Sequence, residues 1–144
     1  MLSAAAVVVC ALDLLGRSHA IAPITLLPST PRSASTNAEA FVSYEPPTIY
    51  LITSTDAFRE AERGVSGHAA GEGCRKIASI IVHEEWHLRH GADERGAYEA
   101  QLTALAALGA SSPLITSVRQ SMVAVIERQK RAAHPAQLVA ARQD

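Results

Sequence analysis

The strongest constraint on this chain is a pair of histidines spaced four residues apart within a predicted helix. His83 and His87 frame the segment His-Glu-Glu-Trp-His. Residues four apart lie on one face of a helix, so the two imidazoles can bind one metal ion. Glu84 directly follows His83 and can act beside such an ion without binding it. The spacing therefore favours a metal site built on this helix.

The helix that carries the two histidines is predicted over residues 74–90. At about 100° per residue its apolar side chains form one stripe, which contains Ile77, Ile80, Ile81 and Leu88. Glu84 falls inside this stripe and the histidines fall at its edge. An unpaired carboxylate in so poorly solvated a place is costly, and a role as general base would offset that cost. Gly91 is expected to end the helix as a glycine C-cap.

A third metal ligand is expected on the next helix, predicted over residues 94–108 with Asp93 as its N-cap. Glu94 lies on the inward stripe of that helix, whereas Glu99 points away from the stripe, so Glu94 is the favoured ligand. Asp93 is a rival because it lies six residues after His87, where the pattern His-Glu-x-x-His-x-x-Gly-x-x-His has its third ligand. Glu99 is the other rival.

His90 lies on the same side of the helix as the two candidate ligands. However, His83 and His90 are about 10 Å apart along the helix axis, and both cannot reach one zinc ion at about 2 Å. We therefore expect His90 to face solvent or to support the site without binding the metal.

The residues from His83 to Gln101 resemble a known family. His83-Glu84-Glu85-Trp86-His87, followed by Glu94-Arg95-Gly96-Ala97-Tyr98-Glu99-Ala100-Gln101, looks like the zincin metallopeptidases. The likeness is strongest to their glutamate-ligand branch, the gluzincins, and to small bacterial proteins of that type. The resemblance spans about residues 48–108. It also implies that the strand at 48–53 is the sheet edge along which a peptide could lie.

This resemblance implies a zinc-dependent hydrolase, and most specifically a metallopeptidase. One Zn²⁺ ion would be held by His83, His87 and Glu94, with the fourth position left for water. Glu84 would act as general base on that water. Tyr98 shares a stripe with Glu94 and could donate a hydrogen bond to the oxyanion, although packing in the core would also explain it. The alternative is a non-catalytic, zincin-derived domain in which zinc is structural or the fold serves binding.

Composition and charge narrow the other function classes. With 48% apolar and 19% charged residues, the 144-residue chain suits one globular domain. A formal charge of −1 argues against a nucleic-acid partner. The expected partner is a peptide or protein substrate.

The first residues suggest export. The apolar run at residues 1–16 is too short for a membrane span, which needs about 20 residues, but it suits a signal peptide over residues 1–22. No Lys or Arg precedes the run and Asp13 interrupts it, so a cytoplasmic protein is the alternative to a periplasmic or secreted one. If the signal is removed, Cys10 leaves with it, and Cys74 is expected to be buried and unpaired.

The remaining pattern predicts an α+β, mostly helical fold. Residues 23–40 are rich in Pro, Ser and Thr and are expected to be a linker. A small zincin-like domain should follow over residues 41–134, with short strands at 41–44 and 48–53, the two ligand-bearing helices and a long C-terminal helix. Residues 135–144 are expected to be a tail.

Overall fold

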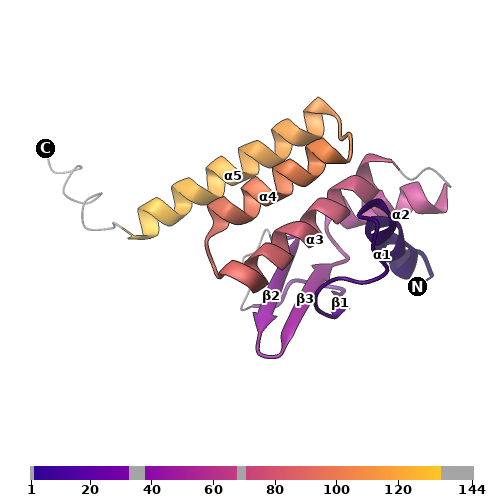
Figure 1. Cartoon of the computed structure of the whole chain (residues 1–144), viewed down its shortest axis with the longest axis horizontal. Helices are drawn as coiled ribbons and strands as arrows, with labels where there is room; N and C mark the ends of the chain where they lie inside the picture. Colours follow the sequence, from indigo (N-terminus) through magenta and orange to yellow (C-terminus); the bar gives the residue numbers. More distant parts are fainter. Residues whose placement is uncertain (1, 33–37, 68–70, 134–144) are drawn as a thin grey trace, which may run out of the picture.

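The computed structural model describes residues 2–32, 38–67 and 71–133, so the predicted tail lies outside the described residues. The elements follow in the order α1 (Leu2–Leu14), β1 (Ile24–Leu27), β2 (Ala40–Tyr44), β3 (Pro47–Ile52), α2 (Asp56–Ser66), α3 (Glu72–His90), α4 (Glu94–Ala107) and α5 (Ser112–Ala133). This architecture confirms the predicted α+β, mostly helical fold class (Figure 1).

The three strands form one small sheet in the order β1-β3-β2. β1 pairs with β3 in parallel, and β2 pairs with β3 as an antiparallel hairpin. β3 is therefore the central strand, and the expectation that residues 48–53 form a sheet edge is wrong. The edge strand that flanks the candidate site is β2. The segment predicted as a linker, residues 23–40, contains β1, whose apolar side chains Ile24 and Leu26 pack against the core.

Helix α3 is the centre of the fold. It packs against β2 and β3 on one side, against α4 on another, and against α1 and α2 near its N-terminal half. Helix α5 packs along α4 (Figure 1). The main core lies between α3, the sheet and the first two helices, and its buried members include Val7, Ile49, Leu51, Phe58, Ile77 and Ile81.

Helix α1 is part of this core in the full chain. Val7, Ala11 and Leu12 are buried against the other elements. Removal of residues 1–22 as a signal peptide stays a prediction. Among the described residues, no helix combines the length and apolar character needed to cross a membrane.

A disulfide bond joins Cys10 of α1 to Cys74 in the first turn of α3. The expectation that Cys74 is buried is confirmed. That it is unpaired is expected only for a chain from which Cys10 has been removed, and this stays a prediction. The two cysteines are 64 residues apart in sequence, so no local pattern predicts that they meet.

A second link between the N-terminal segment and α3 is an ion pair. The guanidinium of Arg17 donates to both carboxylate oxygens of Glu85 at 2.7 and 2.6 Å, and the backbone N–H of Ile21 donates to the same carboxylate at 2.9 Å. Burial raises the pKa of Glu85, but these hydrogen bonds outweigh it and leave the pKa below its usual value. Glu85 is thus bound by the N-terminal segment and does not belong to the candidate metal site.

We predict that Arg17→Met destabilises the full chain by about 3 kcal/mol, because it leaves a buried carboxylate without its cation. A carboxyl group whose pKa is lowered by folding stabilises the fold above its unfolded pKa, about 4.3 for Glu. That stabilisation is lost as the pH falls. The penalty of Arg17→Met should therefore shrink below about pH 4, as measured by urea unfolding at several pH values. Arg119→Met, an exposed site on α5, is the control and should stay within about 0.5 kcal/mol of wild type.

Candidate metal centre

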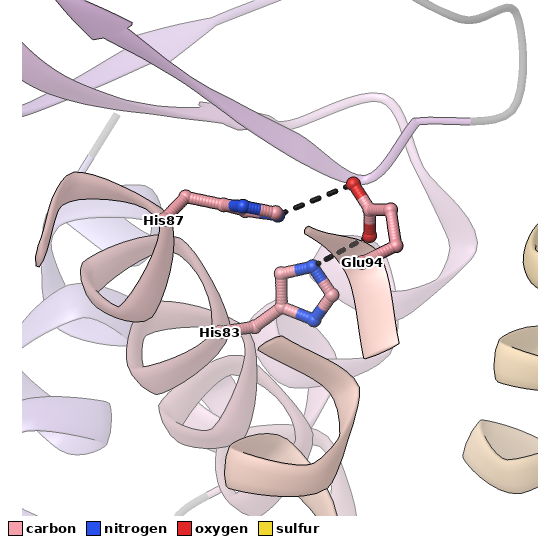
Figure 2. A group of neighbouring side chains, drawn as sticks. All are labelled: His83, His87 and Glu94. Atoms are coloured by element: carbon pink, nitrogen blue, oxygen red, sulfur yellow. Dashed lines mark ion pairs between the residues drawn. The ribbon is translucent and has the colours of Figure 1, made fainter. Parts of the chain in front are cut away.

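Three of the predicted residues meet at the junction of α3 and α4. The candidate ligand atoms of His83, His87 and Glu94 all lie within 4.8 Å of one another. The Nε2 atom of each histidine is 3.2 Å from one oxygen of the Glu94 carboxylate. Figure 2 shows the two rings rising from one helix toward that carboxylate. This group could hold a metal ion.

The turn between the helices brings Glu94 back over α3. Gly91 ends α3 with a φ of +99°, a left-handed conformation that favours glycine. Asp93 then caps α4, because its carboxylate accepts from the backbone N–H groups of Arg95 and Gly96 at 3.2 and 3.3 Å. Glu94 follows as the first residue of α4. The predicted glycine stop and the predicted N-cap are both confirmed.

The two rival ligands lie outside the cluster. The side chain of Asp93 is engaged in capping α4 and is exposed, and Glu99 is also exposed. His90 is exposed as well, and its Nδ1 lies 3.1 Å from the carbonyl oxygen of Trp86. Of the carboxylates considered, only Glu94 reaches both imidazoles.

Both histidines are oriented by a partner at the other ring nitrogen. The Nδ1 of His83 lies 2.8 Å from Oε1 of Gln101, and the Nδ1 of His87 lies 2.7 Å from the carbonyl oxygen of Gly91. Each partner is an acceptor, so each Nδ1 carries a proton that it donates. Each Nε2 is then left to face Glu94. Imidazoles that bind a metal through one nitrogen usually donate through the other in this way.

This arrangement calls for a positive charge between the three side chains. A neutral imidazole protonated at Nδ1 has only a lone pair at Nε2. Two such lone pairs would face two carboxylate oxygens, which are also acceptors. Protons on the imidazoles or a bound cation resolve the conflict. A metal ion does so while satisfying all three groups at once.

The charged groups in the cluster depend on one another. Burial raises the pKa of Glu94, but hydrogen bonds and positive charge from His83 and His87 outweigh it and hold that pKa at about 2. Burial lowers the pKa of His87, but Glu94 and the Gly91 carbonyl raise it above its usual value. Glu94 is therefore anionic at neutral pH, as a metal ligand must be.

Glu84 lies beside the cluster without belonging to it. Its residue surface is 6% exposed, and it forms no hydrogen bond with the described residues. Burial raises the pKa of its carboxyl group to about 7, although the positive charges of His83 and His87 oppose that rise. A buried carboxyl group with a pKa near neutrality suits a group that takes and returns a proton.

Tyr98 packs against a candidate ligand. Its ring meets the ring of His83 edge to face, with centroids 4.6 Å apart. Burial is the first cause of a raised pKa of about 12, so the phenol keeps its proton at neutral pH. Tyr98 also lines the same cleft as His83, Glu84 and Glu94, so its packing against His83 does not exclude a role as hydrogen-bond donor.

The cluster opens into a cleft of about 940 Å³. One wall is formed by β2 and the residues before it, the floor by α3 and α4, and the other wall by α5. Its lining includes His83, Glu84, His87, Glu94 and Tyr98. At the rim Glu39 and Lys76 form an ion pair at 3.2 Å.

Two supporting residues were not predicted from the sequence. At the level of the sequence, Gln101 is only the last residue of the stretch that resembles gluzincins, and Arg17 lies within the predicted signal peptide, residues 1–22. The available signal for Gln101 was a long polar side chain on the inward stripe of its helix, since a buried polar group needs a partner. For Arg17 there was no such signal, because its partner lies 68 residues away.

Comparisons with protein-family models, with curated proteins and with solved structures each gave no match for this chain. The resemblance to zincins therefore stays a prediction based on residues 83–101.

The ligand set can be tested by metal binding. We predict that His83→Ala, His87→Ala and Glu94→Gln each abolish stoichiometric binding of Zn²⁺, as measured by calorimetric titration and by metal analysis after gel filtration. Asp93→Asn, which preserves an N-cap, and Glu99→Gln should bind Zn²⁺ as the wild type does. Loss of Zn²⁺ binding in either control would contradict the assignment of Glu94 as the third ligand.

The close approach of α3 to α4 can be tested at Gly96. A Cβ atom at this position would lie 2.2 Å from Cζ2 of Trp86. In a helix, Gly→Ala normally stabilises by about 0.5–1 kcal/mol. Here the clash reverses the sign, and we expect Gly96→Ala to cost about 1–3 kcal/mol and to weaken Zn²⁺ binding, since Glu94 is two residues away.

A second substitution distinguishes the clash from other effects of Gly96→Ala. Trp86→Phe removes the ring atoms that the new Cβ would meet. If the clash is the cause, Gly96→Ala should cost less in the Trp86→Phe background than in the wild type, as measured by urea unfolding. An equal cost in both backgrounds would place the cause elsewhere.

Proposed function

We propose that this chain is a zinc-dependent hydrolase and, more specifically, a metallopeptidase. The observation that carries the proposal is the pair of imidazoles, each donating through Nδ1, whose Nε2 atoms face the carboxylate of Glu94 at 3.2 Å. Histidine and carboxylate donors in this number suit Zn²⁺ with an open position. A structural zinc site, by contrast, usually has four protein ligands.

The chemistry would be divided among the metal and two side chains, Glu84 and Tyr98. When bound, the metal would supply a Lewis acid that acidifies water and polarises a carbonyl group. Glu84, buried next to both histidines, would take a proton from the attacking water and deliver it to the leaving amine. Tyr98 keeps its hydroxyl proton and lines the same cleft, so it could donate a hydrogen bond to the developing oxyanion.

A peptide substrate is supported by the strand beside the cluster. Among the described residues β2 pairs with no strand other than β3, and it lines the cleft. An extended peptide could therefore add to its free edge through backbone hydrogen bonds. Every second side chain of the peptide would then point toward the face of the sheet that carries α3 and the metal site.

We also propose an extracytoplasmic location, with the cytoplasm as the alternative. The disulfide between Cys10 and Cys74 supports this, because such bonds persist in oxidising compartments. The support applies only to a chain that keeps Cys10. Export and removal of residues 1–22 are therefore separate proposals, and mass spectrometry of the exported protein would distinguish them.

The function can be tested with Glu84→Gln. This variant should bind Zn²⁺ as the wild type does, yet hydrolyse a peptide library or casein about 10²–10⁴-fold more slowly. Glu99→Gln, on the exposed face of α4, is the matched control and should retain full activity. Undiminished hydrolysis by zinc-loaded Glu84→Gln would rule out Glu84 as the base.

The same assay tests the alternative function. A wild-type protein that binds Zn²⁺ stoichiometrically but cleaves no substrate in the library would favour a non-catalytic domain. In that case the zinc would be structural or would serve the binding of a partner.

A further inference from the structure

A buried chain of hydrogen bonds leads from the backbone of α3 to the candidate ligand His83. The hydroxyl of Ser79 donates to the carbonyl oxygen of Lys76 at 2.7 Å. The amide Nε2 of Gln101 donates to Oγ of Ser79 at 3.2 Å, and Oε1 of Gln101 lies 2.8 Å from Nδ1 of His83. Ser79, Gln101 and His83 are all buried, so water does not compete for these groups.

The direction of every hydrogen bond in this chain is fixed by its first member. A backbone carbonyl can only accept, so the single hydroxyl proton of Ser79 points to Lys76. Ser79 then offers a lone pair to α4, and only the NH₂ end of the Gln101 amide can meet it. The amide oxygen of Gln101 must therefore face His83.

An amide oxygen is also only an acceptor. The Nδ1 of His83 consequently has to carry the proton, and its Nε2 is directed toward Glu94. His87 reaches the same state differently, since its Nδ1 donates to the backbone carbonyl of Gly91. One candidate ligand is thus oriented by the main chain and the other by a side chain.

We propose that Gln101 is a positioning residue that holds His83 in the tautomer and ring orientation needed to bind the metal, and that Ser79 sets the orientation of the Gln101 amide. The proposal rests on the metal-binding part of the proposed function and is independent of the reaction catalysed. It also explains why α3 and α4 are joined by buried hydrogen bonds through Gln101 at a position where an apolar side chain could fill the space.

The central test replaces Gln101 with methionine, which is similar in length but lacks the amide. Gln101→Met should lower the affinity for Zn²⁺ about 10–100-fold, the usual effect of losing such a partner, as measured by competition with a chromophoric chelator. Gln101→Glu keeps an acceptor in front of Nδ1 and should retain an affinity close to that of the wild type. Gln120→Met makes the same change at an exposed position of α5 and should leave the affinity unchanged.

A spectroscopic measurement separates positioning from simple packing. In zinc-loaded wild type, ¹⁵N-edited spectra of the imidazoles should show both His83 and His87 protonated at Nδ1. Zinc bound to Nε2 would keep the proton on Nδ1 in any variant, so the comparison is made with the metal-free proteins at alkaline pH, where the imidazoles are neutral. There the signal of His83 in Gln101→Met should shift to a mixture of tautomers, while that of His87 stays as in the wild type. A wild-type affinity together with an unchanged His83 signal in Gln101→Met would overturn the proposal.

Ser79→Ala provides a test if Gln101→Met fails to fold. Alanine suits a helix and fills most of the same space, so the fold should persist while the Gln101 amide becomes free to rotate. A several-fold loss of Zn²⁺ affinity is expected, and no loss would count against the role of Ser79. If the wild type itself binds no Zn²⁺, the metal site and this proposal both fail. If Zn²⁺ binds but no substrate is cleaved, the proposed peptidase function fails and this proposal stands.

Discussion

The fold depends on burying three consecutive ionisable side chains on one helix. His83, Glu84 and Glu85 of α3 are 7%, 6% and 3% exposed. Successive helical positions point in directions about 100° apart, so no single neighbour can satisfy all three. The chain provides His83 and Glu85 with partners on different sides of α3. Gln101 and Glu94 of α4 meet His83, Arg17 and the Ile21 N–H meet Glu85, and Glu84 faces the cleft.

This division of partners explains the arrangement of the other elements. The segment after α1 has to lie along α3 for Arg17 to reach Glu85, and the disulfide from Cys10 holds α1 to the same helix. α4 has to fold back at Gly91 for Glu94 to reach both imidazoles. The space left beside Glu84 is bounded by β2 and α5. Glu84, which forms no hydrogen bond with the described residues, therefore lines the open cleft.

The parts of the site that could be predicted from sequence are those encoded at short range. The histidine spacing, the glycine at the end of α3, the Asp93 cap and the choice of Glu94 over Glu99 all follow from helical geometry within residues 83–101. Long-range contacts carry no such periodic signal. The Cys10–Cys74 bond, the Arg17–Glu85 pair and the position of β2 at the sheet edge depend on how distant segments meet. Strand β1 has only four residues, and the prolines, serines and threonines around it are typical of a linker, so the sequence did not indicate a strand there.

The three candidate ligands all fall within residues 83–94, and this short interval has a consequence for folding. The entropy lost when a bound ion closes a loop grows with the length of that loop. An ion bridging His83, His87 and Glu94 would close only the short turn at Gly91. Its binding would therefore depend mainly on the two helices α3 and α4 and little on the rest of the chain. These two helices could then capture an ion before the N-terminal segment has docked on α3. Metal binding and the docking of α1 would in that case be two steps of maturation, and the oxidation of Cys10 and Cys74 would accompany the second.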